Sequence, residues 1–306
     1  MGGGGGGYFP SNPDRLQRLI EEARGTEAQQ RLDSNVNELL QDALATFNSR
    51  NAERVREYLT KVQETIGDEI EMEQFLFGGS VAKHTYVDGL SDVDALVILN
   101  RDDLAKKPPR EVLKTFHESL SDRLTYDEIS SIEKGRMAVT ITYRNGTQIQ
   151  LLPAVRVRGK VAIPSATANE WNETNPKAFQ KELTKANERL NGTLVPSIKL
   201  VKSIIGGLPE QKRLTGYHIE SLCLESVSGY RGVKTVKGVV LHALEEASFR
   251  VLRPLGDVTG QSRVVDSYLG KANSVERRIV ADAIAGIGRR LKAATTVEEW
   301  KKVLDA

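Results

Sequence analysis

The acidic residues Asp92 and Asp94 are the strongest chemical signal in the sequence. They lie two residues apart in an apolar stretch, Asp92–Leu99, that is typical of a β-strand, and residues two apart on a strand leave the same face. A hard cation such as Mg²⁺ prefers oxygen ligands, and proteins hold it with one or two carboxylates together with substrate phosphates. The pair therefore predicts a site for Mg²⁺ or Mn²⁺.

A glycine-rich turn precedes the acidic pair. Gly78, Gly79 and Ser80 follow an apolar predicted strand, 72–77, and a short predicted helix separates the turn from the acids. Glycines let a phosphate approach the backbone, while the Ser80 hydroxyl and the N–H groups at the helix start can donate to it. Each feature alone is common in ordinary turns and strand ends. Their order favours a nucleoside triphosphate held between a phosphate-binding turn and a metal.

This order resembles the DNA polymerase β-like nucleotidyltransferase superfamily, whose signature is a Gly-Ser turn followed by paired acids. The resemblance implies an α+β fold, with a polymerase β-like catalytic sheet and an α-helical second lobe, and an enzyme that transfers nucleotides with release of pyrophosphate. It predicts a catalytic core with N-terminal helices over 13–165 and a helical lobe that completes the nucleotide cleft over 166–306. The six glycines at 2–7 independently predict a flexible Gly-rich tail over 1–12.

A predicted hairpin carries the place of a third catalytic acid. Residues 137–143 alternate as in a strand, Asn145-Gly146 is a strong two-residue turn signal, and residues 147–152 return antiparallel. In the family, a third carboxylate leaves the returning strand just before an apolar pair. Gln150 stands there in this chain, and no Asp or Glu lies between residues 134 and 169.

The neutral amide of Gln150 changes the chemistry that we expect. The third carboxylate completes the metal that activates the attacking hydroxyl, or takes its proton, and glutamine ligates a hard cation poorly. In one interpretation the protein binds nucleotide and catalyses weakly or not at all. In the other, Gln150 replaces a natural glutamate in order to trap a substrate complex. The sequence leaves both open.

The second half of the chain extends the resemblance. Residues 171–176, Trp-Asn-Glu-Thr-Asn-Pro, resemble a turn found after the catalytic core of bacterial cyclic GMP-AMP synthase-like nucleotidyltransferases, the CD-NTases. The predicted helix that begins near Val195-Pro196 carries Lys202, at the place of a family lysine that reaches the triphosphate. The resemblance thus implies a phosphate contact for Lys202.

Residues 215–220, Thr-Gly-Tyr-His-Ile-Glu, resemble the Ser-Tyr-His segment of that family. The resemblance implies that Tyr217 stacks on the bound base. Gly216 stands in the place of the serine that touches phosphate, so we expect Thr215 to supply that hydroxyl if any residue does. His218 is interpreted as a helix-start or core residue.

Composition limits the classes of protein. Lys and Arg number 43 and Asp and Glu 41, so the net charge of +2 does not indicate a nucleic-acid binder. One cysteine, Cys223, excludes an intrachain disulfide and suits a reducing cytoplasm. No apolar run approaches the roughly 20 residues that a membrane-spanning helix needs, so we expect a cytoplasmic protein with no membrane partner.

Several element boundaries are predicted from local signals. We expect a first helix that begins at Pro13 and ends at Gly25, followed by further helices through Phe47 and over 51–66, all packed against the core that follows. Three cations are predicted to alternate along one extended segment, and a last helix is predicted from Ser274 to about Thr296. The three cations are Arg156, Arg158 and Lys160.

Three functions remain at this point. The first is a bacterial defence-type CD-NTase, which uses NTPs or dNTPs to make a cyclic or short linear oligonucleotide messenger for a downstream effector protein. The second is a template-independent terminal transferase, similar to CCA-adding enzymes, that extends an oligonucleotide primer. The third is a non-catalytic nucleotide sensor, which keeps the pocket without the third acid.

Overall fold

The structure is a computed structural model. It describes residues 13–47, 52–67, 72–77, 83, 85, 93–99, 103–125, 127–165, 167–175, 177–256, 258–259 and 265–305. The predicted tail, Gly79, Ser80 and Asp92 lie outside these residues, and only the backbone of Asp94 is described.

Seven strands in the described part of the chain form the sheet of the first lobe. They are β1 (Met72–Phe77), β2 (Val93–Leu99), β3 (Ile129–Lys134), β4 (Val139–Tyr143), β5 (Gln148–Val157), β6 (Lys160–Pro164) and β7 (Trp171–Glu173). The main order is β1-β2-β5-β4-β3, and β6 pairs with β5 and β7. Strands β2 and β5 run parallel and the other pairs antiparallel. The strands predicted at 72–77 and before residue 99, and the predicted hairpin, are confirmed.

Alternating burial gives the sheet two different faces. On β4 and β5, Val139, Ile141 and Leu151 are fully buried and pack in one core with α2 (Ala52–Gly67) and α4 (Pro109–Arg123). Thr140 and Gln150, which point to the opposite face, are only half-buried. The sheet therefore has one apolar face covered by helices and one face that carries polar side chains at the centre of the sheet.

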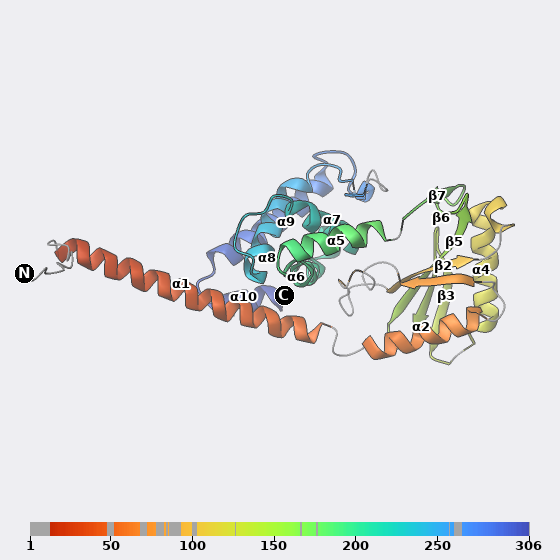
Figure 1. Cartoon of the computed structure of the whole chain (residues 1–306), viewed down its shortest axis with the longest axis horizontal. Coiled ribbons are helices and arrows are strands. Elements are labelled where there is room, and N and C mark those ends of the chain that lie inside the picture. The colour runs from red at the N-terminus through yellow and green to blue at the C-terminus, as the bar shows by residue number, and fades with distance from the viewer. Residues whose placement is uncertain are drawn as a thin grey trace, which may run out of the picture.

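The second lobe is helical and lies beside the sheet lobe (Figure 1). Its helices are α5 (Ala178–Arg189), α6 (Leu194–Gly206), α7 (Gly216–Ser226), α8 (Val236–Arg250), α9 (Val275–Ala293) and α10 (Val297–Leu304). They enclose a second core, with Ile198, Val240, Leu244, Ile284 and Trp300 at its centre. Short 3₁₀ turns occur at Leu104–Lys106, Glu210–Lys212 and Ser267–Leu269.

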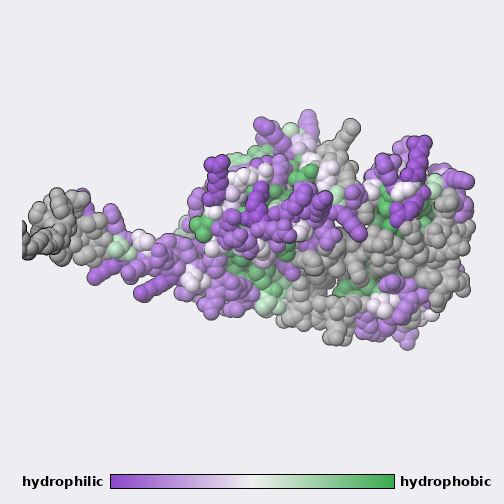
Figure 2. Space-filling model, in the orientation of Figure 1, coloured by the Kyte–Doolittle hydropathy of each residue, from purple (hydrophilic) through white to green (hydrophobic). Residues whose placement is uncertain are grey.

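The N-terminal helix α1 (Pro13–Thr46) corrects two expectations. It continues through Gly25, because this glycine has no left-handed backbone and good helix formers flank it, so its cost of about 1 kcal/mol is tolerated. Its buried residues Val36 and Leu40 belong to the core of the helical lobe, whereas we expected the N-terminal helices on the catalytic core. Only α2 lies there. The first half of α1 extends beyond the lobe (Figure 1), and its residues 21–30 are exposed on a mostly hydrophilic surface (Figure 2).

One further expectation was wrong for a local reason. Arg158 and Gly159 both have positive φ, 52° and 78°, and form the two-residue turn between β5 and β6, so the three cations do not share one extended segment. The last predicted helix, from Ser274 to about Thr296, is confirmed as α9 with Ser274 as its N-cap, and it ends slightly earlier, at Ala293, because the chain becomes extended at Ala294. The further helix α10 begins after its own cap, Thr296.

Candidate functional site

Strand register places Gln150 directly beside Asp94. In the parallel pair β2 and β5 the Cα atoms of Asp94 and Gln150 are opposite each other, and Gln150 in turn pairs with Thr140 on β4. Neighbouring strands lie about 4.8 Å apart, so residue 150 is within one strand spacing of the second acid. The two residues predicted from separate segments are therefore adjacent, while their catalytic roles stay predictions.

The donor set around Asp94 and Gln150 suits a metal only in part. Asp94 brings a carboxylate and Gln150 a neutral amide, and Asp92 lies outside the described residues. Across the described ranges, no group of three or more His, Cys, Asp and Glu residues could hold a metal ion. A divalent cation would thus depend on the Asp92–Asp94 pair and substrate phosphates, with no charge from position 150.

Lys202 lies in a buried cluster that the sequence did not predict. Its ammonium donates to Glu220 Oε1 over 2.7 Å and to the Thr85 carbonyl over 3.1 Å. Lys83 and the Thr85 hydroxyl donate to the same Glu220 carboxylate. In the sequence, Lys83 and Thr85 follow the Gly-Ser turn, while Lys202 and Glu220 lie in the two segments of the second half that resemble the family.

Burial and charge act against each other in the cluster. Burial alone would raise the pKa of Glu220, but the adjacent Lys83 and Lys202 ammonium groups outweigh it and lower that pKa. The pKa of Lys202 is lowered by burial, which the attraction of Glu220 only partly offsets because Lys83 repels it. The Glu220 carboxylate is therefore paired with two buried ammonium groups, those of Lys83 and Lys202.

Tyr217 has the exposure that a stacking residue needs. Its exposed fraction is 38%, although the flanking His218 is buried. Its ring lies 5.2 Å from the Phe179 ring, and the Lys83 ammonium lies 4.9 Å from its centroid. The aromatic surface therefore adjoins the Glu220 cluster, while base stacking by Tyr217 stays a prediction.

The hydroxyl of Thr215 has a structural task. Thr215 is the N-cap of α7, and its hydroxyl accepts a hydrogen bond from the His218 N–H over 3.4 Å. Its own N–H donates to the Tyr268 hydroxyl. The phosphate contact that we expected from Thr215 would therefore compete with the helix cap.

Serine at position 216 is expected to strengthen nucleotide binding. A Cβ on Gly216 would lie 3.5 Å from Lys202 Nζ, an ordinary contact, and the backbone is not left-handed. The new hydroxyl would add about one hydrogen bond, so we expect Gly216→Ser to lower the Kd for an NTP about fivefold, measured by calorimetry. Gly216→Ala is the control for the hydroxyl, and equal affinities of the two variants would contradict the prediction.

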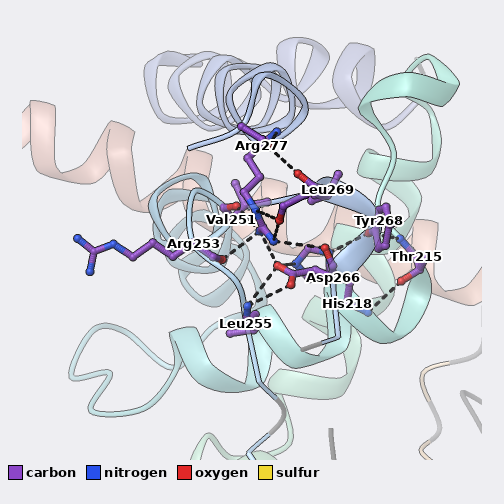
Figure 3. A network of polar contacts seen from close by, with 11 residues as sticks. Thr215, His218, Val251, Arg253, Leu255, Asp266, Tyr268, Leu269 and Arg277 are labelled. Atoms are coloured by element: carbon purple, nitrogen blue, oxygen red, sulfur yellow. Dashed lines mark hydrogen bonds and ion pairs between the residues drawn. The ribbon is translucent and has the colours of Figure 1, made fainter. Parts of the chain in front are cut away.

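His218 joins a polar network at the start of α7 (Figure 3). Its Nδ1 lies 2.8 Å from the Tyr268 hydroxyl, and its Nε2 lies 3.6 Å from an Asp266 oxygen without a hydrogen-bond partner among the described residues. Burial lowers its pKa to about 4, since the attraction of Asp266 is opposed by Arg277. His218 is therefore a neutral core residue at pH 7.

Acid should destabilise the fold through His218. Below a pH of about 6.5, the pKa of His218 in the unfolded chain, the unfolded chain binds a proton at His218. The folded chain does not bind this proton until the pH falls to about 4. We expect His218 to lower the free energy of unfolding by about 2 kcal/mol between pH 7 and pH 5. Urea unfolding at both pH values measures this loss. His218→Gln should lose that part of the pH dependence, and an unchanged dependence would contradict the assignment.

The sheet with its parallel pair β2 and β5, together with the helical lobe beside it, forms a polymerase β-like nucleotidyltransferase fold. The chain belongs to the Second Messenger Oligonucleotide or Dinucleotide Synthetase (SMODS) family, whose model matches residues 24–187, more than half of the chain. The resemblance to bacterial CD-NTases is thereby confirmed. No curated protein matches the chain in sequence.

Solved structures share the fold at low sequence identity. E. coli MS115-1 CdnC, solved with ATP, is 17% identical with a TM-score of 0.61, and the match covers 87% of this chain and 97% of that chain. Bradyrhizobium diazoefficiens CD-NTase CdnG, solved with GTP, is 14% identical with a TM-score of 0.64, covering 87% and 94%. The Capnocytophaga granulosa CdnE c-di-GMP synthase is 18% identical with a TM-score of 0.61, covering 92% and 95%. These matches confirm the α+β fold.

None of the helices in the described ranges has the length and apolar character needed to cross a bilayer.

Proposed function

We propose that this chain is a Mg²⁺-dependent nucleotidyltransferase of the bacterial cytoplasm, which joins NTPs or dNTPs into a cyclic or short linear oligonucleotide signal in antiphage defence. The observation that carries the proposal is the strand register that sets Gln150 beside Asp94. Family membership supports it, as do the nucleotides in the names of the CdnC and CdnG structures.

The proposed reaction is an in-line displacement at phosphorus. A 3′- or 2′-hydroxyl oxygen of one nucleotide bonds to the α-phosphorus of another, the bond from that phosphorus to the β-phosphate breaks, and pyrophosphate leaves with the electron pair. The hydroxyl proton passes to a base. A bound Mg²⁺ would offset the charge on the reacting phosphate oxygens. In this chain Asp92 and Asp94 would hold it, while Gly79, Ser80 and Lys202 bind phosphates and Tyr217 orients the base.

Gln150 makes the chain as written a poor catalyst in this proposal. An amide carries no negative charge and does not take a proton near neutral pH, so it replaces neither function of a third carboxylate. Because glutamine has nearly the same size as glutamate, Gln150 preserves the packing at this half-buried position on β5. Nucleotide binding should therefore survive while turnover is slow, whether Gln150 is natural or engineered.

The oligonucleotide product would act on a separate effector protein. E. coli CdnC was solved in complex with a HORMA protein, so a protein partner is known for one relative. For this chain we propose NTP or dNTP substrates, a soluble product and a downstream effector, with no membrane partner.

The test is product formation without a primer. Gln150→Glu protein is incubated with mixtures of labelled NTPs and dNTPs in Mg²⁺ or Mn²⁺, and products are separated by size and by resistance to phosphatase. Acceptor-free oligomers would support the proposal. Strict dependence on an added oligonucleotide would overturn it in favour of a terminal transferase, and tight NTP binding without any product would favour a nucleotide sensor.

A further inference from the structure

One buried carboxylate connects two parts of the chain that are distant in sequence. Glu220 on α7 accepts hydrogen bonds from Lys83, Thr85 and Lys202. Lys83 and Thr85 follow the predicted phosphate-binding residue Ser80 by three and five positions, whereas Lys202 and Glu220 belong to the helical lobe. Glu220 thus ties the segment after the turn to the second lobe.

The burial of this cluster makes the charge of Glu220 essential to it. The exposed fractions of the side chains are 9% for Lys83, 4% for Lys202 and 1% for Glu220. Water screens such charges weakly, and a buried ion that loses its partner is strongly unfavourable. Without the carboxylate the two ammonium groups would repel each other, and Lys83 and Thr85 would lose the hydrogen bonds that they donate to Glu220.

Lys83 extends the connection to the predicted base site. Its ammonium lies 4.8 Å from the centre of the Phe179 ring and 4.9 Å from that of Tyr217, in the range of a cation–π contact. The same cation therefore contacts Glu220 and the exposed ring of Tyr217. Lys83, Lys202 and, through Lys83, the ring of Tyr217 are thus all linked to one carboxylate.

We propose, on the basis of the function proposed above, that Glu220 is a positioning residue of the nucleotide site. Its carboxylate holds Lys83, Thr85 and Lys202, and through Lys83 the ring of Tyr217, in one arrangement, so that an NTP meets its phosphate and base contacts already placed. Glu220 acts through the two lysines and does not touch the substrate.

Calorimetric titration of each NTP in Mg²⁺ tests the proposal on the full chain as written, because binding does not require turnover. Glu220→Gln keeps the size of the side chain and removes its charge. We expect an affinity about 10- to 100-fold weaker for the NTP that the parent binds, since small misplacements of binding groups have effects of this size. Lys83→Met should weaken NTP binding to a similar extent. The double variant should bind the NTP no more weakly than the single variant with the lower affinity, because the pair acts as a unit.

Two variants separate positioning from loss of stability. Glu220→Asp keeps the charge and should restore part of the affinity. Asp33→Asn removes the carboxylate of another lysine pair, with Lys237 between α1 and α8, and should leave NTP affinity unchanged. All titrations are made well below the melting temperature of each variant. Unchanged affinity of Glu220→Gln would overturn the proposal, and tighter binding would overturn it by showing that Glu220 competes with phosphate.

Hydrogen exchange without nucleotide decides the proposal separately. The amides of Lys83 and Thr85 should exchange faster in Glu220→Gln than in the parent, because their side-chain attachment is lost. If the parent binds no NTP, the proposed function fails. Unchanged exchange at these two amides would then overturn the positioning role of Glu220 on its own.

Discussion

Glutamate in place of Gln150 is expected to raise the rate of pyrophosphate release in Mg²⁺ by about 10²- to 10⁴-fold, the usual contribution of a positioned general acid or base. The substitution changes an amide to a carboxylate at nearly constant size, at a half-buried position beside Asp94. A second carboxylate there repels the first, so its pKa rises until a divalent cation neutralises the pair. The gain should therefore depend on the metal, and release of pyrophosphate from all NTPs and dNTPs measures it.

The chain offers a control for the position of the new charge. Gln148 lies two residues earlier on the same strand and face, opposite Thr142, and is exposed. Gln148→Glu should leave the rate near that of the parent, because it is not the residue aligned with Asp94. Adding Asp94→Asn to Gln150→Glu should remove the gain. A gain in Gln148→Glu alone would show that the third acid belongs one pair earlier, and no gain in either variant would contradict the catalytic role.

The sheet could be predicted from the sequence because its signals are local. The Asn145-Gly146 signal marks the hairpin, and Gly146 has a positive φ of 85°. The loop has three residues, 144–146, in place of the predicted two, because the Gly146 N–H donates to the Tyr143 carbonyl and Tyr143 lies opposite Thr147. Apolar alternation on both sides of the loop indicates the register. Pro109 at the first turn of α4 likewise marks a helix start. Once β2 and β5 are neighbours, the juxtaposition of Asp94 and Gln150 follows from the register.

Features that depend on contacts between residues far apart in the sequence, or on the wider context of a helix, were harder to predict. Gly25 is an ordinary helix-ending signal, and only the continuous helix α1 shows that the flanking residues override it. The packing of α1 on the helical lobe involves contacts between residues far apart in sequence, such as the hydrogen bond that the Lys237 N–H at the start of α8 donates to the Asn37 side chain, 200 residues earlier. The Glu220 cluster joins residues 135 and 137 positions apart, a separation at which no periodic pattern carries information.

The ion pair between Asp266 and Arg277 should give the largest change in stability. Both side chains are fully buried, and Arg277 donates to Asp266 over 2.6 Å and to the carbonyls of Val251, Arg253 and Gly270 over 2.9–3.0 Å (Figure 3). We expect Asp266→Asn to lower the free energy of unfolding by about 3–5 kcal/mol, because it leaves a buried guanidinium without its anion. Urea unfolding at pH 7.5 measures the loss.

An exposed pair shows how much of this loss comes from burial. Lys160 and Glu173 lie 2.7 Å apart with exposed fractions of 68% and 51%, and Glu173→Gln should change the free energy of unfolding by less than about 1 kcal/mol. If Asp266→Asn cost no more than this, the buried pair would not hold the segment between α8 and α9. A large loss of stability would also disturb the predicted nucleotide site. The segment between α8 and α9 carries Tyr268, whose hydroxyl accepts a hydrogen bond from the N–H of Thr215 at the start of α7. Asp266→Asn should therefore also weaken the helix start that presents Tyr217.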